Sequence, residues 1–246
     1  MAEPLNSSNV SGSRSGFSIA ISEVLEAPLP EGDLGEGLIL RTDRGVISAI
    51  LHRAEGGDQG VIWVCGARGG FRGPGAGTYP RLAERFRELG ISSLRLDYRQ
   101  PNQLAECVLD LLAGAAFFRS YGHQPVVVVG HSFGGAVVIA AGALSSHICG
   151  VVSLSPQTYG ANMAGQVSPR PLLVVHGKAD TRLPYSCGAQ IYDWAREPKR
   201  LVLYEGAEHR LEECREELEE LLSAWIPETL ARQDLVPGNG ELSEQS

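Results

Sequence analysis

One stretch of the 246-residue chain, Val126 to Gly135, constrains the fold more than any other. It begins with four consecutive valines, and such a short β-branched run is typical of a strand buried on both faces of a parallel sheet. Residues 130–134 then read Gly-His-Ser-Phe-Gly, which has the pattern G-x-S-x-G, and the small apolar residues from Ala136 to Leu144 predict a helix. The order of strand, sharp turn and helix predicts an α/β fold that presents Ser132 at the end of a central strand.

The glycines of this motif have a steric purpose. A turn this tight forces the serine into a strained backbone conformation, and only residues without a Cβ fit beside it, so Gly130 and Gly134 supply those places. The first N–H groups of the following helix would point at the Ser132 hydroxyl. The alternative interpretation is a Gly-Ser turn at a helix start with Ser132 as an ordinary cap, and the flanking pattern favours the strained turn.

Strands and helices alternate along the rest of the chain, which predicts right-handed crossovers and a mostly parallel sheet flanked by helices. The other predicted strands span residues 17–25, 38–42, 46–52, 61–65, 93–96, 150–154, 171–175 and 200–204. The predicted helices cover residues 79–89, 101–115, 136–144, 185–196 and 211–225. Asp43-Arg44-Gly45 is a plausible hairpin turn between the second and third strands.

We expect a single α/β domain over residues 17–227. Residues 1–16 are rich in Ser, Asn and Gly and predict a disordered segment, while residues 228–246 predict a polar, acidic tail. From Glu212 to the end the chain holds ten acids and two arginines, so this part carries the whole net charge of −8. With no basic stripe elsewhere, we expect no nucleic-acid partner and no membrane partner.

The five cysteines are odd in number and have no paired spacing, which indicates reduced thiols and a cytoplasmic location. We expect no secretory signal, because no basic start leads into an apolar run, and no apolar run is long enough for a membrane helix. No cysteine or histidine cluster indicates a metal, and we expect no cofactor. A monomer or a homodimer is expected.

Two later residues complete a hydrolytic constellation with Ser132. Serine is a poor nucleophile unless a base stands beside it, and in this architecture the acid and then the histidine follow the serine along the chain. Asp180 comes just after the strand Pro-Leu-Leu-Val-Val, and His209 just after the strand Leu-Val-Leu-Tyr. Both therefore lie at carboxyl ends of parallel strands, where active groups gather. We expect Ser132 to attack, His209 to carry the proton and Asp180 to orient the imidazole.

Rival residues are weaker candidates. Asp97 also ends a strand, but its neighbours Tyr98 and Arg99 predict a structural ion pair. His131 lies inside the turn and should point elsewhere, and His176 is predicted to be a structural hydrogen-bonding residue. The remaining histidines have no placement at a strand end: His52, His123 and His147.

An oxyanion needs two fixed N–H donors. We expect one from Phe133, the residue after the serine, and the other from Ala67, in the Gly-rich loop that follows residues 61–65. That loop could instead be a phosphate cradle, but the pattern G-x-x-x-x-G-K-[ST] is absent.

With these residues in place, the chain resembles the α/β-hydrolases, close to the lidless dienelactone-hydrolase and small-esterase branches. The resemblance covers roughly Val61 to Trp225 and rests on the segments GHSFGG, HGKADTRLP and GAEHRL. It implies the α/β-hydrolase fold without a cap domain. The chain departs from the family in two places. The loop after the third strand of that family usually begins His-Gly, where this chain has Cys65-Gly66, and the dienelactone hydrolases proper have a cysteine nucleophile where this chain has Ser132.

Two functions remain open from the sequence. The first is a serine hydrolase that cleaves a small carboxylic ester or thioester through an acyl-enzyme, and the second is a non-catalytic binding protein on the same scaffold. The intact Ser-Asp-His set favours the enzyme. The segment Ser155 to Arg170 is too short and too rich in Gly and Pro for a lid, which favours short acyl chains. Arg68, Arg72 and Arg182 either ring the pocket and favour acidic substrates or are solvated loop residues, and the second interpretation is favoured. The physiological substrate is not determined by these motifs.

Overall fold

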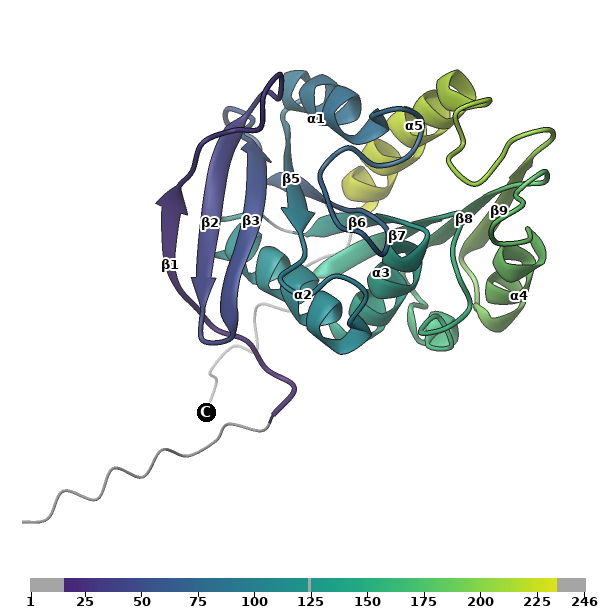
Figure 1. Cartoon of the computed structure of the whole chain (residues 1–246), viewed down its shortest axis with the longest axis horizontal. Helices are drawn as coiled ribbons and strands as arrows, with labels where there is room; N and C mark the ends of the chain where they lie inside the picture. Colours follow the sequence, from purple (N-terminus) through teal and green to yellow (C-terminus); the bar gives the residue numbers. More distant parts are fainter. Residues whose placement is uncertain (1–15, 124, 234–246) are drawn as a thin grey trace, which may run out of the picture.

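The computed structural model describes residues 16–123 and 125–233. Within these residues nine strands form one sheet in the order β1-β2-β3-β5-β4-β6-β7-β8-β9 (Figure 1). The strands are β1 Ile21–Glu26, β2 Glu36–Thr42, β3 Gly45–His52, β4 Gln59–Val64, β5 Ile91–Asp97, β6 Val126–His131, β7 Ile148–Leu154, β8 Leu172–Gly177 and β9 Lys199–Tyr204. The helices are α1 Thr78–Glu88, α2 Leu104–Ser120, α3 Phe133–Leu144, the 3₁₀ turn η1 Ala164–Gln166, α4 Ser186–Trp194 and α5 Arg215–Gln233.

The sheet has an antiparallel side and a parallel side. β1, β2, β3 and β5 pair antiparallel, and the predicted turn at residues 43–45 joins β2 to β3. All pairings from β5 to β9 are parallel. The mostly parallel α/β sheet predicted from the alternating pattern is therefore confirmed.

Helices cover both faces of the sheet, so its central strands are apolar on both sides. Val61 and Trp63 of β4 belong to a core shared with α1 and α5, while Ile62 and Val64 belong to a core shared with α2 and α3. This is the period-two alternation of a pleated strand. Figure 1 shows α1 and α5 together on one side of the sheet and α2, α3 and α4 on the other. This burial on both faces explains the run of four valines in β6.

The strand order reverses next to β6. The chain passes from β4 to β5 on one side and then crosses back to place β6 on the other side of β4. In open parallel sheets, ligands bind at the carboxyl ends of the strands at this reversal. The loop after β4 and the turn after β6 meet there, and they carry Ala67 and Ser132.

No helical cap is inserted between β7 and β8. Residues 155–171 contain only the short turn η1. Val167 is buried and Met163 packs against the core, whereas Tyr159 is 75% exposed. These three residues recur at intervals of four, which would allow a single helical turn over the site. The segment instead packs onto the domain through Met163 and Val167. The absence of a cap domain predicted from its length is thus confirmed.

Two predicted boundaries are wrong. The domain was expected to end at Pro227, but α5 continues through that proline to Gln233. The reason is burial, since Ile226, Thr229 and Leu230 are covered by the sheet, and this contact outweighs the hydrogen bond that a proline removes. The first strand begins at Ile21, four residues after the expected start at Phe17. The predicted disordered segment, apart from Gly16, and the tail beyond Gln233 lie outside the described residues.

Candidate active site

Ser132 occupies the strained turn that the sequence predicts. Its φ of 59° is in the left-handed region, which is costly for a residue with a side chain. The glycines beside it permit this conformation. A Cβ on Gly130 would lie 2.1 Å from the carbonyl oxygen of Gly134, and a Cβ on Gly134 would lie 2.2 Å from the carbonyl oxygen of Cys65. Both separations are far below van der Waals contact, so the two glycines are required for the turn.

The hydroxyl of Ser132 faces His209 and does not cap the helix. Ser132 is the N-cap residue of α3, yet its side chain makes no capping hydrogen bond. Its Oγ lies 3.0 Å from Nε2 of His209. The alternative interpretation of Ser132 as an ordinary helix cap is therefore wrong.

His209 and Asp180 complete a chain of hydrogen bonds with Ser132. His209 follows β9 and is 7% exposed, and its Nδ1 lies 2.7 Å from Oδ2 of Asp180. With the Nδ1 hydrogen donated to this carboxylate, Nε2 is free to accept the hydrogen of the Ser132 hydroxyl. The structure thus brings together the three side chains that the sequence assigns to nucleophile, base and acid.

Asp180 is held as a carboxylate. Burial alone would raise the pKa of this side chain, but hydrogen bonds from the N–H of Leu183, from His209 and from the N–H of Arg182 outweigh that effect and lower the pKa below its ordinary value. These bonds stabilise the negative charge that faces His209.

Asp97 has a different role from the one predicted. It makes no ion pair with Arg99, whose guanidinium bonds Asp110 and Glu106. Its Oδ1 instead accepts the N–H groups of Gly70 at 2.7 Å and of Tyr98 at 2.9 Å. The prediction of an ion pair is wrong because Asp97 accepts hydrogen bonds from backbone N–H groups, one of them in the loop after β4.

Two rival histidines lie against the site. Nε2 of His131 is 2.9 Å from the carbonyl oxygen of His209, and the two rings are 5.0 Å apart. Nε2 of His176 is 3.1 Å from Oδ2 of Asp180. The sequence gives no signal for the first contact, because it joins residues far apart in the chain. The contact between His176 and Asp180 could be predicted, because the two residues are four positions apart across the end of a strand. Two of the other histidines bond or stack away from these residues: His52 with Glu84 and Arg95, and His123 on Phe118.

Ala67 and Phe133 present unused N–H groups near Ser132. Neither amide donates a hydrogen bond to any described residue. The residue before Ala67, Gly66, is so close to Ser132 that a Cβ on it would lie 3.4 Å from the serine Cβ. Ala67 directly follows Gly66 in an exposed loop, and Phe133 directly follows Ser132 at the start of α3, so both residues flank the serine. The arrangement fits an oxyanion site.

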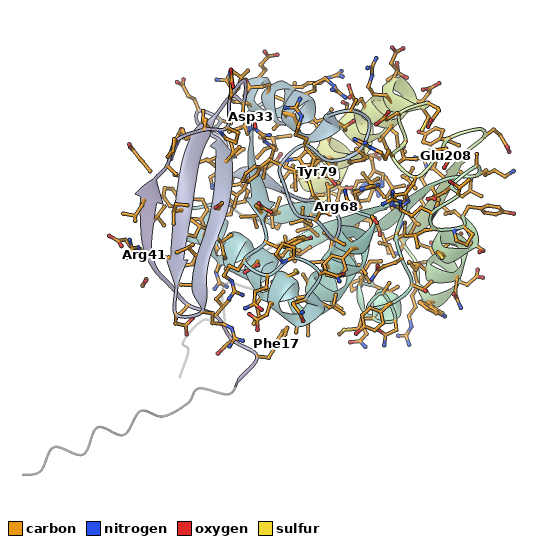
Figure 2. The ribbon with its side chains drawn as sticks, in the orientation of Figure 1. Phe17, Asp33, Arg41, Arg68, Tyr79 and Glu208 are labelled. Atoms are coloured by element: carbon orange, nitrogen blue, oxygen red, sulfur yellow. The ribbon has the colours of Figure 1, made fainter. Side chains whose placement is uncertain are left out.

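The loop carrying Ala67 is anchored from several sides. Its Gly70 N–H bonds Asp97, its Phe71 carbonyl accepts from Arg95 at 3.2 Å, and its Gly75 N–H bonds the carbonyl of Arg210 at 2.7 Å. The last contact joins this loop to the residue after His209. Figure 2 labels Arg68 on this loop and Glu208 on the loop after β9. These anchors fix the backbone even though the family's usual His-Gly start is replaced by Cys65-Gly66.

Charged and metal-binding groups add little to the site. Arg68, Arg72 and Arg182 are exposed, and their side chains form no ion pair with any described residue. Among residues 16–123 and 125–233, no group of three His, Cys, Asp or Glu side chains is placed to hold a metal. Over the same residues, no helix combines the length and apolar character needed to cross a membrane.

Acid should destabilise the fold partly through His131. Burial lowers the pKa of this imidazole to about 4. Between its ordinary value and pH 4 the unfolded chain therefore binds a proton that the native state does not, and stability is lost as pH falls through that range. We expect the free energy of unfolding, measured by urea denaturation, to drop from pH 7 to pH 5. The drop should be smaller in His131→Gln, by up to about 1.4 kcal/mol per pH unit. Equal drops in the two proteins would show that His131 does not cause the effect.

A family model described as "Alpha/beta hydrolase family" matches residues 67–238. Among curated proteins, an uncharacterized protein of Escherichia coli, YfhR, is 48% identical over 50 residues. That match covers 20% of this chain and 18% of the relative, so this chain spans under a fifth of the relative's length in the comparison.

Solved structures share the fold at low identity. Est1E from Butyrivibrio proteoclasticus has a TM-score of 0.67 at 18% identity and covers 79% of this chain and 99% of its own. A dienelactone hydrolase from Anabaena variabilis has a TM-score of 0.66 at 19% identity, covering 84% and 99%. A serine hydrolase without lid from Xanthomonas campestris has a TM-score of 0.61 at 21% identity, covering 82% and 99%.

Proposed function

Because this chain belongs to the alpha/beta hydrolase family, we propose that it is a serine hydrolase that cleaves a small carboxylic ester or thioester. The observation that carries the proposal is the continuous hydrogen-bond chain from Ser132 through His209 to Asp180, with distances of 3.0 and 2.7 Å. A binding protein on the same scaffold has no need of a strained serine aligned with a base and an acid.

The proposed reaction has two halves. His209 takes the hydroxyl proton as Ser132 attacks the acyl carbon, and the carboxylate of Asp180 stabilises the imidazolium that forms. The N–H groups of Ala67 and Phe133 donate to the oxyanion. His209 then gives its proton to the leaving alcohol or thiol, which departs and leaves an acyl-enzyme. In the second half, His209 takes a proton from the water that attacks this ester, and it returns that proton to Oγ of Ser132 as the acid product departs.

The substrate proposed for this site is short. Residues 155–171, where a cap would be inserted, fold onto the core, so this segment offers no cover for a long acyl chain. We expect the highest kcat/KM on soluble esters such as p-nitrophenyl acetate and butyrate, and no rate jump when a substrate passes its solubility limit. The measurement is a p-nitrophenyl series from acetate to palmitate, with and without emulsion. A preference for palmitate, or activation by emulsion, would rule out the uncovered short-chain site.

We also propose a cytoplasmic location and a monomer or homodimer without nucleic-acid or membrane partners. The support for the location lies in the cysteines, all of which fall within the described residues. None forms a disulfide, and burial raises the pKa of the Cys65 thiol to about 11, which leaves it unreactive beside the site.

A further inference from the structure

His176 contacts the site through a single tautomer that the structure defines. The side chain lies on β8, is fully buried, and its Nε2 is 3.1 Å from Oδ2 of Asp180 and 3.0 Å from the carbonyl oxygen of Leu183. Both neighbours are acceptors, so Nε2 must carry the hydrogen. Nδ1 is buried without a partner among the described residues, so a second proton there would leave a buried, charged donor unsatisfied. The ring is therefore neutral, and burial lowers its pKa in agreement with that state.

The Asp180 carboxylate is surrounded by donors on both oxygens. Oδ1 accepts the N–H groups of Arg182 and Leu183 at 2.9 and 2.8 Å. Oδ2 accepts from His209 at 2.7 Å and from His176 at 3.1 Å. His176 is thus the donor that shares an oxygen with His209, so the two imidazoles draw on the same negative charge.

The local fold fixes His176 in this contact. The turn after β8 brings the N–H of Asp180 back to the carbonyl of Gly177 at 3.3 Å, and this returns the carboxylate over the strand end. On the other side, α4 packs on the ring at Gly188, where a Cβ would lie 2.8 Å from Nδ1. The imidazole is therefore held between α4 and Asp180 and cannot swing away from the carboxylate.

From these contacts we propose that His176 is a positioning residue of the proposed hydrolase, one that aligns the Asp180 carboxylate and moderates its pull on the proton shared with His209. The inference rests on the proposed function. Without the His176 donor, more of the charge on Oδ2 would face His209, so the imidazolium would persist to higher pH. His176 would then set the pH at which the base becomes available.

Other titratable or charged groups also lie near Asp180 and His209, and they must stay unchanged in the test. Glu208 and Arg210 flank His209 in the loop after β9, and His131 approaches from the end of β6. Cys187, which belongs to α4, lies near Asp180. Arg182 follows Asp180 in its own loop. None of these residues is altered by a substitution at position 176, so a shift in the pH profile reports the His176 contact.

The experiment compares His176→Leu, which removes the donor, with His176→Gln, whose amide can donate from the place of Nε2. The pH dependence from pH 5 to 9 is measured both for kcat/KM on p-nitrophenyl acetate and for the rate of Ser132 labelling by a fluorophosphonate. In His176→Leu we expect the midpoint of the acid limb to rise by about half to one pH unit, and the plateau of kcat to fall about tenfold with little change in KM. His176→Gln should return both values toward wild type.

The outcomes are distinguishable. Failure of wild type to label at Ser132 would overturn the proposed function and this inference with it. If wild type labels normally, two results would overturn the inference alone. One is an unmoved acid limb in folded His176→Leu, and the other is a pH midpoint and kcat of His176→Gln that lie no nearer to wild type than those of His176→Leu. Should the leucine variant fail to fold, the glutamine variant and the imidazole ¹⁵N shifts of wild type decide. The predicted state has Nε2 protonated and Nδ1 bare, and the opposite tautomer would overturn the proposal.

Discussion

Replacing Ser132 by alanine is expected to reduce ester hydrolysis by about 10³- to 10⁶-fold while the protein stays folded. The hydroxyl is the only group that the substitution removes, and it lies 3.0 Å from Nε2 of His209 without capping α3. The fold should be unaffected, because alanine can replace a side chain that makes no structural bond. The measurement is kcat/KM on p-nitrophenyl acetate with purified wild type and Ser132→Ala, and circular dichroism checks the fold.

Ser146→Ala provides the control for this variant. Ser146 is exposed just after α3 and takes no part in the site, so its alanine variant should keep wild-type turnover. Full activity in purified Ser132→Ala would show that Ser132 is not the nucleophile.

Replacing Gly134 by alanine should damage both stability and activity, although helix propensity alone favours alanine in α3 by about 1 kcal/mol. The new Cβ would lie 2.2 Å from the carbonyl oxygen of Cys65 and 3.0 Å from that of Val64. Both atoms are backbone, so α3 and the loop carrying Ala67 must move apart. Overpacking of this kind costs about 1–3 kcal/mol. Turnover should fall more than tenfold, because the same movement displaces the oxyanion donors.

The control for Gly134→Ala is Gly206→Ala. Gly206 has a φ of 70° and open space around it, so its variant carries backbone strain of about 1 kcal/mol without a clash. Comparing the urea midpoints of the two variants separates the cost of backbone strain from the cost of the clash between the new Cβ and the backbone. Wild-type stability and turnover in Gly134→Ala would mean that the contact between the turn and β4 is looser than these distances require.

The parts of the fold and site that local pattern determines were predictable from the sequence. The strained turn at Ser132 needs glycines at fixed offsets, and strand ends carry Asp180 and His209 at spacings that the intervening helices and strands can bridge. The end of α5 was not predictable, because a proline in the middle of a helix is tolerated only when buried neighbours such as Ile226 and Leu230 compensate for it.

Contacts between distant segments were also beyond sequence reasoning. The sequence predicts an ion pair of Asp97 with its neighbour Arg99, whereas Asp97 accepts the N–H of Gly70, 27 residues away, besides that of adjacent Tyr98. His131 was expected to point away, yet it bonds the carbonyl of His209, 78 residues along the chain. Periodicity and spacing give no information on such pairs, because only the strand order brings the loops after β4, β6 and β9 together.

The most direct test of the proposed function is covalent labelling of the native protein with a fluorophosphonate, read by intact mass and peptide mapping. The hydrogen-bond chain from Ser132 to Asp180 predicts one adduct per chain, located on Ser132, that does not form on urea-unfolded protein or on Ser132→Ala. No adduct on the native protein, or an adduct on another residue, would contradict the assignment of this site as a serine hydrolase.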